Sequence, residues 1–109
     1  MPKERDLQRA VLTYLQYQEN LGRVYFFRNN SFAGYVTRPG QKKPSYIKNN
    51  KPGMPDIVVC YQGRFIGLEL KGTKGKQSEE QKEAERVIHT AGGEYYVIRD
   101  LEEVISLLT

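Results

Sequence analysis

The spacing of apolar residues predicts a helix at the start of the chain and a strand soon after it. Four apolar residues recur at helical spacing and give this helix a single stripe: Leu7, Val11, Tyr14 and Leu15. Gly22 follows as a stop, and the aromatic and branched residues 24–28 then favour a strand. The next stretch is punctuated by Gly, Pro and Asn, which indicates a long loop over residues 29–55.

The second half of the chain predicts two strands, a helix, a fourth strand and a short final helix. The runs IVVCY and RFIGLELK are separated by Gln62-Gly63, a pair that supports a tight hairpin turn. Ser78 and Gln81 fit the capping box of a helix. The expected buried stripe of this helix comprises Ala84, Val87, Ile88 and Ala91. YYVIR is a fourth strand, and Asp100 caps the helix DLEEVISLL.

The order of these elements favours an α/β fold in a single domain spanning residues 1–109. A chain of 109 residues lies within the usual size of one domain. Because a helix connects the third and fourth strands, those strands can pair in parallel, whereas the hairpin strands are antiparallel. The sequence therefore predicts a mixed four-stranded sheet flanked by helices, in the order αβββαβα.

A two-residue turn at Gln62-Gly63 would bring two acids together. Counting back from this turn places Asp56 directly opposite Glu69, and Lys71 points to the same face. Directly opposed side chains have Cβ atoms ~5 Å apart, so the two carboxylates would share one small site. Like charges in this position are destabilising, and a divalent cation bound by both acids would remove the repulsion. The alternative is a surface hairpin with scattered charges.

The cysteine and histidine content limits the metal chemistry of the chain. A single Cys and a single His cannot form the usual zinc site of several Cys and His ligands. A metal would therefore be held by Asp and Glu oxygens, which suits Mg²⁺, Mn²⁺ or Ca²⁺. The apolar runs are far shorter than the ~20 residues of a spanning helix, and no signal-peptide core follows MPKERD. We expect a cytoplasmic protein with no membrane partner and no small-molecule cofactor.

Positive charge is concentrated in one segment of the chain. Between Arg23 and Pro55 there are seven Lys or Arg residues and no Asp or Glu, in a chain of formal net charge +4. Such a block suits nucleic acid, because neutralising phosphates releases condensed counterions. The aromatic residues Phe32, Tyr35 and Tyr46 could stack on unpaired bases. The alternatives are a solvated loop, a mobile insertion or a dimer arm. The candidate phosphate ligands are Arg28, Arg38, Lys42, Lys43, Lys48, Lys51, Lys74 and Lys76.

The two hairpin strands resemble the signature of PD-(D/E)XK nucleases. They carry M-P-D-I-V-V and then G-L-E-L-K after a short turn. Further agreement comes from E-R-D-L-Q in the first helix, K-P-G-M-P-D before the acid, K-Q-S-E-E-Q at the second helix and G-G-E-Y-Y-V-I after it. The combination resembles the VRR-NUC branch, in particular its small free-standing, phage-like members, and covers nearly the whole chain except residues 29–50.

The resemblance implies a restriction-endonuclease-like core and a Mg²⁺-dependent endonuclease, with Mn²⁺ able to substitute, in a bacterial or phage-infected cell. Asp56 and Glu69 would bind the metal together with the backbone carbonyl of Leu70, and Lys71 would orient and help activate the attacking water. The implied substrate is DNA, duplex or branched, and a Holliday-like junction would suit a homodimer. RNA remains an alternative substrate.

Two further residues have both a structural and a functional interpretation. Glu4 shares a side of the first helix with Leu7 and Val11, so it either adds a carboxylate to the metal site, as the resemblance suggests, or favours the helix dipole. Asp6 would replace it if the helix were rotated. Gln81 either only completes the capping box or also binds a water or phosphate as part of the catalytic site.

The sequence leaves three functions to be separated. We expect a divalent-metal-dependent DNA endonuclease. The main alternative is a catalytically silent DNA-binding module of the same fold, and the third is a phage structural or regulatory protein in which the paired acids are accidental.

Overall fold

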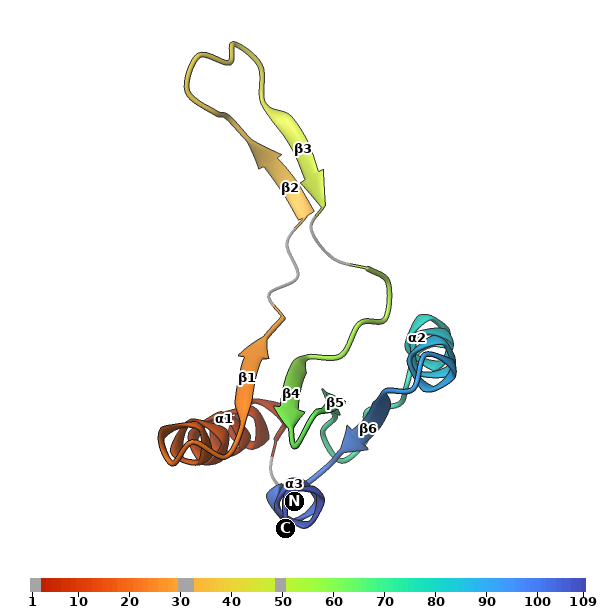
Figure 1. Cartoon of the computed structure of the whole chain (residues 1–109). Helices are drawn as coiled ribbons and strands as arrows, with labels where there is room; N and C mark the ends of the chain where they lie inside the picture. The colour runs from red at the N-terminus through yellow and green to blue at the C-terminus, as the bar shows by residue number, and fades with distance from the viewer. Residues whose placement is uncertain (1–2, 30–32, 49–50) are drawn as a thin grey trace.

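The fold is built on a mixed four-stranded sheet with helices on both sides (Figure 1). The computed structural model describes residues 3–29, 33–48 and 51–109. In chain order the elements are α1 (Glu4–Asn20), β1 (Tyr25–Arg28), β2 (Ala33–Val36), β3 (Ser45–Lys48), β4 (Ile57–Tyr61), β5 (Arg64–Leu70), α2 (Glu79–Thr90), β6 (Glu94–Ile98) and α3 (Leu101–Leu107). The sheet order is β1-β4-β5-β6, with only the β5–β6 pair parallel. The predicted mixed sheet is confirmed.

The prediction of a continuous loop over residues 29–55 is wrong. Within it, β2 and β3 pair antiparallel as a separate hairpin that projects away from the sheet (Figure 1). Tyr35 lies opposite Tyr46, and their rings meet edge to face with centroids 5.4 Å apart. Cross-strand aromatic pairs of this kind stabilise hairpins. Each strand has only four residues, too few for a clear alternating pattern in the sequence. Residues 33–48 are called the arm below.

The turn between β4 and β5 has the predicted form. Gln62 and Gly63 both adopt positive φ angles, 51° and 77°, as a type I′ hairpin turn requires. Ile57 consequently pairs with Leu68, the register expected from the sequence. On the face that this register turns inward, the buried hydrophobic residues are Ile57, Val59, Ile66, Leu68 and Leu70.

The hydrophobic core lies between this face of the sheet and the helices α1 and α3. Leu7, Val11 and Leu15 of α1 are each at most 1% exposed, and the partly buried Tyr14 packs against them, which confirms the predicted stripe. Full burial of such a side chain stabilises the fold by about 1.5–3 kcal/mol. Val104 and Leu108 complete the core from the C-terminal end. Among the described residues, no helix has the length and apolarity needed to cross a membrane.

Helix α2 lies on the opposite face of the sheet and is less buried than predicted. Its capping box between Ser78 and Gln81 is present, as is that of α3 at Asp100. The expected buried stripe is wrong, however, because Val87 is 50% exposed and Ala91 is also exposed. The helix contacts chiefly β6, so an apolar groove remains between it and β1. Phe27, Val58, Phe65, Val87 and Ile88 are among the residues that line this groove.

Candidate active site

Asp56 and Glu69 lie together where β4 begins and β5 ends. Continuing the Ile57–Leu68 register by one residue places Asp56 opposite Glu69, on the face of the sheet that carries α2. The backbone N–H of Leu70 donates to Oδ2 of Asp56 over 2.8 Å. This hydrogen bond holds the Asp56 carboxylate against β5, so the hairpin brings the two acids to one place.

Glu69 is a buried acid in a strongly perturbed environment. Glu69 is only 3% exposed. Burial, followed by the negative charge of Asp56 and a hydrogen bond with it, raises the pKa of Glu69 to about 8, although Lys71 and Tyr95 act in the opposite direction. Without a cation, the acid pair therefore tends to retain a proton at neutral pH.

Three side chains surround the Glu69 carboxylate. Gln81 Nε2 donates to Oε2 over 2.8 Å, and the ammonium of Lys71 lies 3.7 Å from the same oxygen. Tyr95 donates its hydroxyl to Oε1 over 3.4 Å. Lys71 therefore points to the face of the acids, as the alternation of β5 predicts, and Glu69 is held from β5, α2 and β6 at once.

Gln81 completes the predicted capping box and also contacts Glu69, a contact that the sequence did not predict. Its Oε1 accepts from the backbone N–H of Ser78 over 2.8 Å, which completes the capping box. Its Nε2 is then left to bind Glu69. The helix cap therefore fixes which end of the amide faces the acid. That Gln81 binds a water or a phosphate stays a prediction.

Tyr95 and Gly53 belong to the site but were not singled out from the sequence. The Tyr95 hydroxyl also lies 3.5 Å from the carbonyl oxygen of Gly53. Gly53 has a φ of 75°, and a Cβ there would lie 2.1 Å from the carbonyl oxygen of Glu80. The segment before Asp56 is thus pressed against the start of α2. Alternation along β6 could have placed Tyr95 on this face; the close approach of Gly53 carries no sequence signal.

Glu4 is not gathered into the acid pair. It is exposed and lies beside Gly72, where an added Cβ would be 3.8 Å from the Cβ of Glu4. Over the described ranges, no three His, Cys, Asp or Glu side chains form a group able to hold a metal ion. Asp6 is likewise exposed. A carboxylate contribution from α1 therefore stays a prediction.

The donor set fits a hard divalent cation even with two carboxylates. Mg²⁺ is commonly bound through one or two carboxylates, with waters and substrate phosphates in its other positions. Asp56 and Glu69 offer oxygen ligands and a repulsion that positive charge would relieve. The Leu70 carbonyl belongs to the same stretch of β5.

The candidate phosphate ligands fall into two groups. Lys74 and Lys76 are exposed in the segment between β5 and α2, next to the acids along the chain. Arg28 pairs with Ile57 and so lies on the α1 side of the sheet, away from the acids. Lys48 lies in β3, and Phe32 lies outside the described residues. The exposed candidates on or near the arm are Arg38, Lys42, Lys43 and Lys51.

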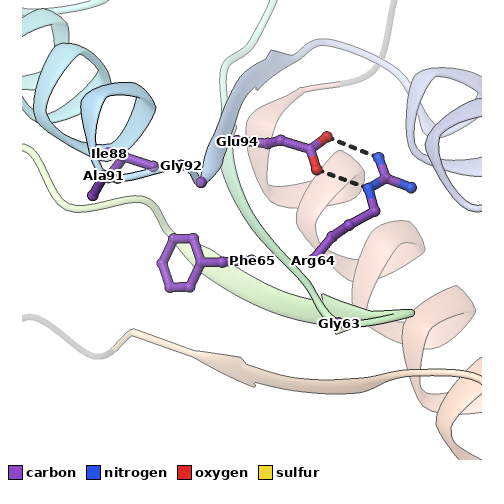
Figure 2. A pocket seen from close by; sticks show the side chains of 8 residues that line it. Gly63, Arg64, Phe65, Ile88, Ala91, Gly92 and Glu94 are labelled. Carbon is purple, nitrogen blue, oxygen red and sulfur yellow. Dashed lines mark hydrogen bonds and ion pairs between the residues drawn. The ribbon is translucent and has the colours of Figure 1, made fainter.

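The other end of β5 is held by an ion pair. Arg64 donates to Glu94 through Nε and Nη2 over 2.7 and 2.8 Å, beside a small pocket (Figure 2). This pairing lowers the pKa of Glu94 to about 2, chiefly through the hydrogen bond from Arg64. It ties β5 to β6 away from the acids, so it supports the sheet rather than the site.

Comparison with known proteins gives a partial match. No family model matches the sequence. A curated protein named elongation factor P, from Aquifex aeolicus (strain VF5), is 34% identical over 80 residues, which are 73% of this chain. The chain spans only 42% of the length of that relative. The match thus covers part of each protein and does not place the chain in a family.

Proposed function

We propose that this chain hydrolyses phosphodiester bonds in DNA, using a divalent cation held at Asp56 and Glu69. The proposal includes membership of the VRR-NUC branch and a restriction-endonuclease-like core. The observation that carries it is the buried Glu69 carboxylate beside the partly buried Asp56, with the ammonium of Lys71 3.7 Å from Glu69. Folding alone gives no reason to place a second acid beside a buried one, whereas phosphodiester hydrolysis needs charged groups gathered at the scissile phosphate.

Mg²⁺ is the proposed cation, with Mn²⁺ able to replace it. The carboxylates of Asp56 and Glu69 and the backbone carbonyl of Leu70 would hold it. Bound there, it supplies positive charge that polarises the phosphodiester and makes an attacking water more acidic. Burial and, after it, the negative charge of Asp56 raise the pKa of Glu69, and a bound cation would oppose both effects by favouring the charged carboxylate.

Lys71 and Gln81 have distinct roles in the proposed reaction. Lys71 orients the attacking water and stabilises negative charge as it develops on the phosphoryl oxygens. Gln81 holds the Glu69 carboxylate through the contact at 2.8 Å. The water oxygen bonds to phosphorus while the bond from phosphorus to one bridging oxygen breaks. The water loses a proton to solvent, and the departing oxygen takes one from solvent.

The substrate is proposed to be duplex or branched DNA. Lys74 and Lys76 would contact phosphates beside the scissile bond. One acid pair per chain cleaves one strand, so two copies acting as a homodimer would suit a four-way junction. We propose neither a membrane partner nor a small-molecule cofactor for this homodimer.

A DNA-binding module without turnover is the second candidate. It is favoured by the Glu69 carboxylate, which already has Gln81, Lys71 and Tyr95 as neighbours. The partial relative, elongation factor P, is also not named as a nuclease. The two candidates share the fold and the basic arm and differ only in turnover.

Cleavage assays separate the two candidates. The purified protein is incubated with four-way junction, flap, nicked, linear duplex and single-stranded DNA, in Mg²⁺ or in EDTA. Cleavage that requires Mg²⁺ and falls at least about a hundredfold in Asp56→Asn supports hydrolysis. Glu102→Gln, at an exposed acid of α3, is the matched control and should cleave normally. Binding in EDTA without cleavage in Mg²⁺ or Mn²⁺ would favour the second candidate.

A further inference from the structure

We propose that the arm holds duplex DNA within one helical turn of the acid pair. The preferred substrate then carries a continuous duplex of roughly eight or nine base pairs on one side of the scissile phosphate. This inference rests on the proposed function and adds the form and the length of the substrate. Four features of the arm support it: its attachment beside Asp56, its maximum reach, the turn at its tip and its two-stranded shape.

The base of the arm is fixed at the acid pair. The backbone N–H of Asn29 donates to the carbonyl of Asp56 over 2.8 Å, and Asn29 Nδ2 donates to the carbonyl of Pro55 over 2.5 Å. The chain thus leaves β1 and re-enters β4 at neighbouring points beside Asp56. Because these hydrogen bonds fix the base of the arm beside Asp56, a ligand that contacts both the acids and the tip must extend from this point along the arm.

The length of the chain limits the reach of the arm. Arg38 is the ninth residue after Asn29, and an extended chain covers at most about 3.3 Å per residue. The tip can therefore lie no more than roughly 30 Å from Asn29, whatever path the chain takes. The arm points away from the sheet in Figure 1, and the longest extent of the molecule is 52 Å. At about 3.4 Å per base pair, this limit corresponds to roughly nine base pairs of duplex at most.

The tip of the arm is an ordered turn that presents positive charge. Gln41 donates its backbone N–H to the carbonyl of Arg38 over 3.0 Å, and its Oε1 accepts from the Arg38 N–H over 3.2 Å. Gly40 has a φ of 83° after Pro39, as in a type II turn. The Gln41 side chain also binds the hydroxyl of Ser45.

Three exposed cations surround this turn: Arg38, Lys42 and Lys43. The sequence places no Asp or Glu between Arg23 and Pro55, so no neighbouring acid in the segment neutralises them. Because hydrogen bonds fix the turn that carries them, these cations lose less backbone entropy on binding phosphates than cations on an unstructured loop would.

The shape of the arm favours duplex DNA over other nucleic acids. A two-stranded ribbon fits the major groove of B-form DNA, whereas the major groove of A-form RNA is deep and narrow. Tyr35 and Tyr46 pack against each other across the ribbon, so both residues have a structural role in stabilising the hairpin. A duplex is stiff over this distance, with a persistence length of about 150 base pairs, so it would connect the tip and the acids at one spacing. A single strand would bend and show no defined length.

A series of DNA lengths tests the spacing. The cleavage position is first mapped on a long substrate, and the duplex is then shortened base pair by base pair from each side. We expect kcat/KM to fall about tenfold or more when one flank becomes shorter than about eight base pairs, and to gain little beyond about twelve. Equal dependence on both flanks without a step, or equal cleavage of single-stranded DNA, would overturn the inference.

Paired charge variants identify the arm as the cause. Lys42→Gln/Lys43→Gln removes two cations of the tip, and Lys82→Gln/Arg86→Gln removes two exposed cations of α2 as the matched control. The arm variant should weaken affinity for long duplex about tenfold and reduce the slope of log Kd against log salt by about two. It should match the wild type on duplexes too short to reach the tip. A smaller effect than that of the control variant would count against the arm.

Fluorescence anisotropy in EDTA measures DNA binding separately from cleavage, so the proposed role of the arm and the proposed hydrolysis can fail independently. A protein that cleaves no substrate but loses affinity for long duplex in the arm variant would refute the proposed hydrolysis and leave the arm in place. A protein that cleaves in Mg²⁺ with no step in flank length and no effect of the arm variant would refute the arm alone.

Discussion

Gln81 joins Glu69 to the first turn of α2 through one amide group. Its nitrogen donates to Glu69 over 2.8 Å while its oxygen accepts from the backbone of Ser78 over 2.8 Å. A residue that would serve any helix as a cap thereby also orients a buried acid. The helix cap can be weakened without touching this amide, because the Ser78 hydroxyl accepts a separate hydrogen bond from the backbone N–H of Gln81 over 3.1 Å.

Gln81→Ala should weaken both the helix and the proposed cation site. Loss of the hydrogen bonds should lower the free energy of unfolding by about 1 kcal/mol, and loss of the Glu69 contact should lower Mn²⁺ affinity about tenfold. Ser78→Ala removes the hydrogen bond from the Gln81 N–H to the Ser78 hydroxyl, also at about 1 kcal/mol, and leaves the Gln81–Glu69 contact in place. Calorimetric titration and urea unfolding measure the two quantities. An equal loss of Mn²⁺ affinity in both variants would assign Gln81 a purely structural role.

The stability of the cation-free protein should depend on the protonation of Glu69. The folded protein holds the proton up to about pH 8, whereas the unfolded carboxyl releases it near pH 4.5. Because the folded state binds more protons in this window, its free energy of unfolding should fall as the pH rises from about 4.5 to about 8. Below this window the contribution is fully present. Urea unfolding in EDTA across the window measures the effect.

Glu69→Gln provides the control for this pH dependence. An amide stays neutral, so the decline between about pH 4.5 and about pH 8 should largely disappear. Saturating Mg²⁺ should raise the stability of the wild type most at the upper end of the range, because binding to the folded state stabilises it. A wild type and variant with parallel pH profiles would show that the carboxyl of Glu69 is not perturbed.

Gly53→Ala should be far more destabilising than the same change at a comparable glycine. At Gly53 the φ is 75° and an added Cβ would meet the Glu80 carbonyl oxygen at 2.1 Å. Gly22 has a φ of 76° with no atom within 4 Å of the added Cβ, so Gly22→Ala measures the backbone cost alone. That cost is about 1–2 kcal/mol. Thermal unfolding and cleavage of both variants test whether the contact with α2 holds the segment before Asp56.

Lys71→Gln should separate cation binding from turnover. The ammonium lies beside Glu69 but is not an oxygen ligand, so Mn²⁺ affinity should change by only a few fold. The proposed stabilisation of developing charge should be lost, with kcat falling about a hundredfold to a thousandfold. Lys74→Gln, at an exposed neighbour, controls for the loss of one charge. A variant with normal kcat and a raised KM would assign Lys71 to substrate binding instead.

The hairpin of β4 and β5 was predictable because local chemistry determines it. Two residues that both accept positive φ specify the turn, and the turn specifies which residues face each other. The position of Asp56 opposite Glu69 follows by counting. Caps such as Ser78 and Asp100 were predictable for the same reason, since their partners lie three residues away.

Contacts between distant segments were harder to predict from the sequence. The contact of Tyr95 with Glu69 depends on where a crossover places β6, and β2–β3 pairing depends on two strands of only four residues. The apolar stripe of α2 identified apolar residues but not what covers them, so Val87 was wrongly expected to be buried. Sequence periodicity indicates an apolar side of a helix; only tertiary structure determines whether a partner lies against it.

The hydrogen bonds from Asn29 to Pro55 and Asp56 have one further consequence. They hold together the two points at which the chain leaves and rejoins the sheet, so the length of the segment between them is not fixed by the sheet. For a flexible segment, doubling the length costs only about 0.6 kcal/mol in closure entropy. Insertions or deletions there would change the distance to the tip while β4 and β5 kept their register. The length of the arm, and with it the size of the proposed ligand, can therefore change without altering the sheet that carries Asp56 and Glu69.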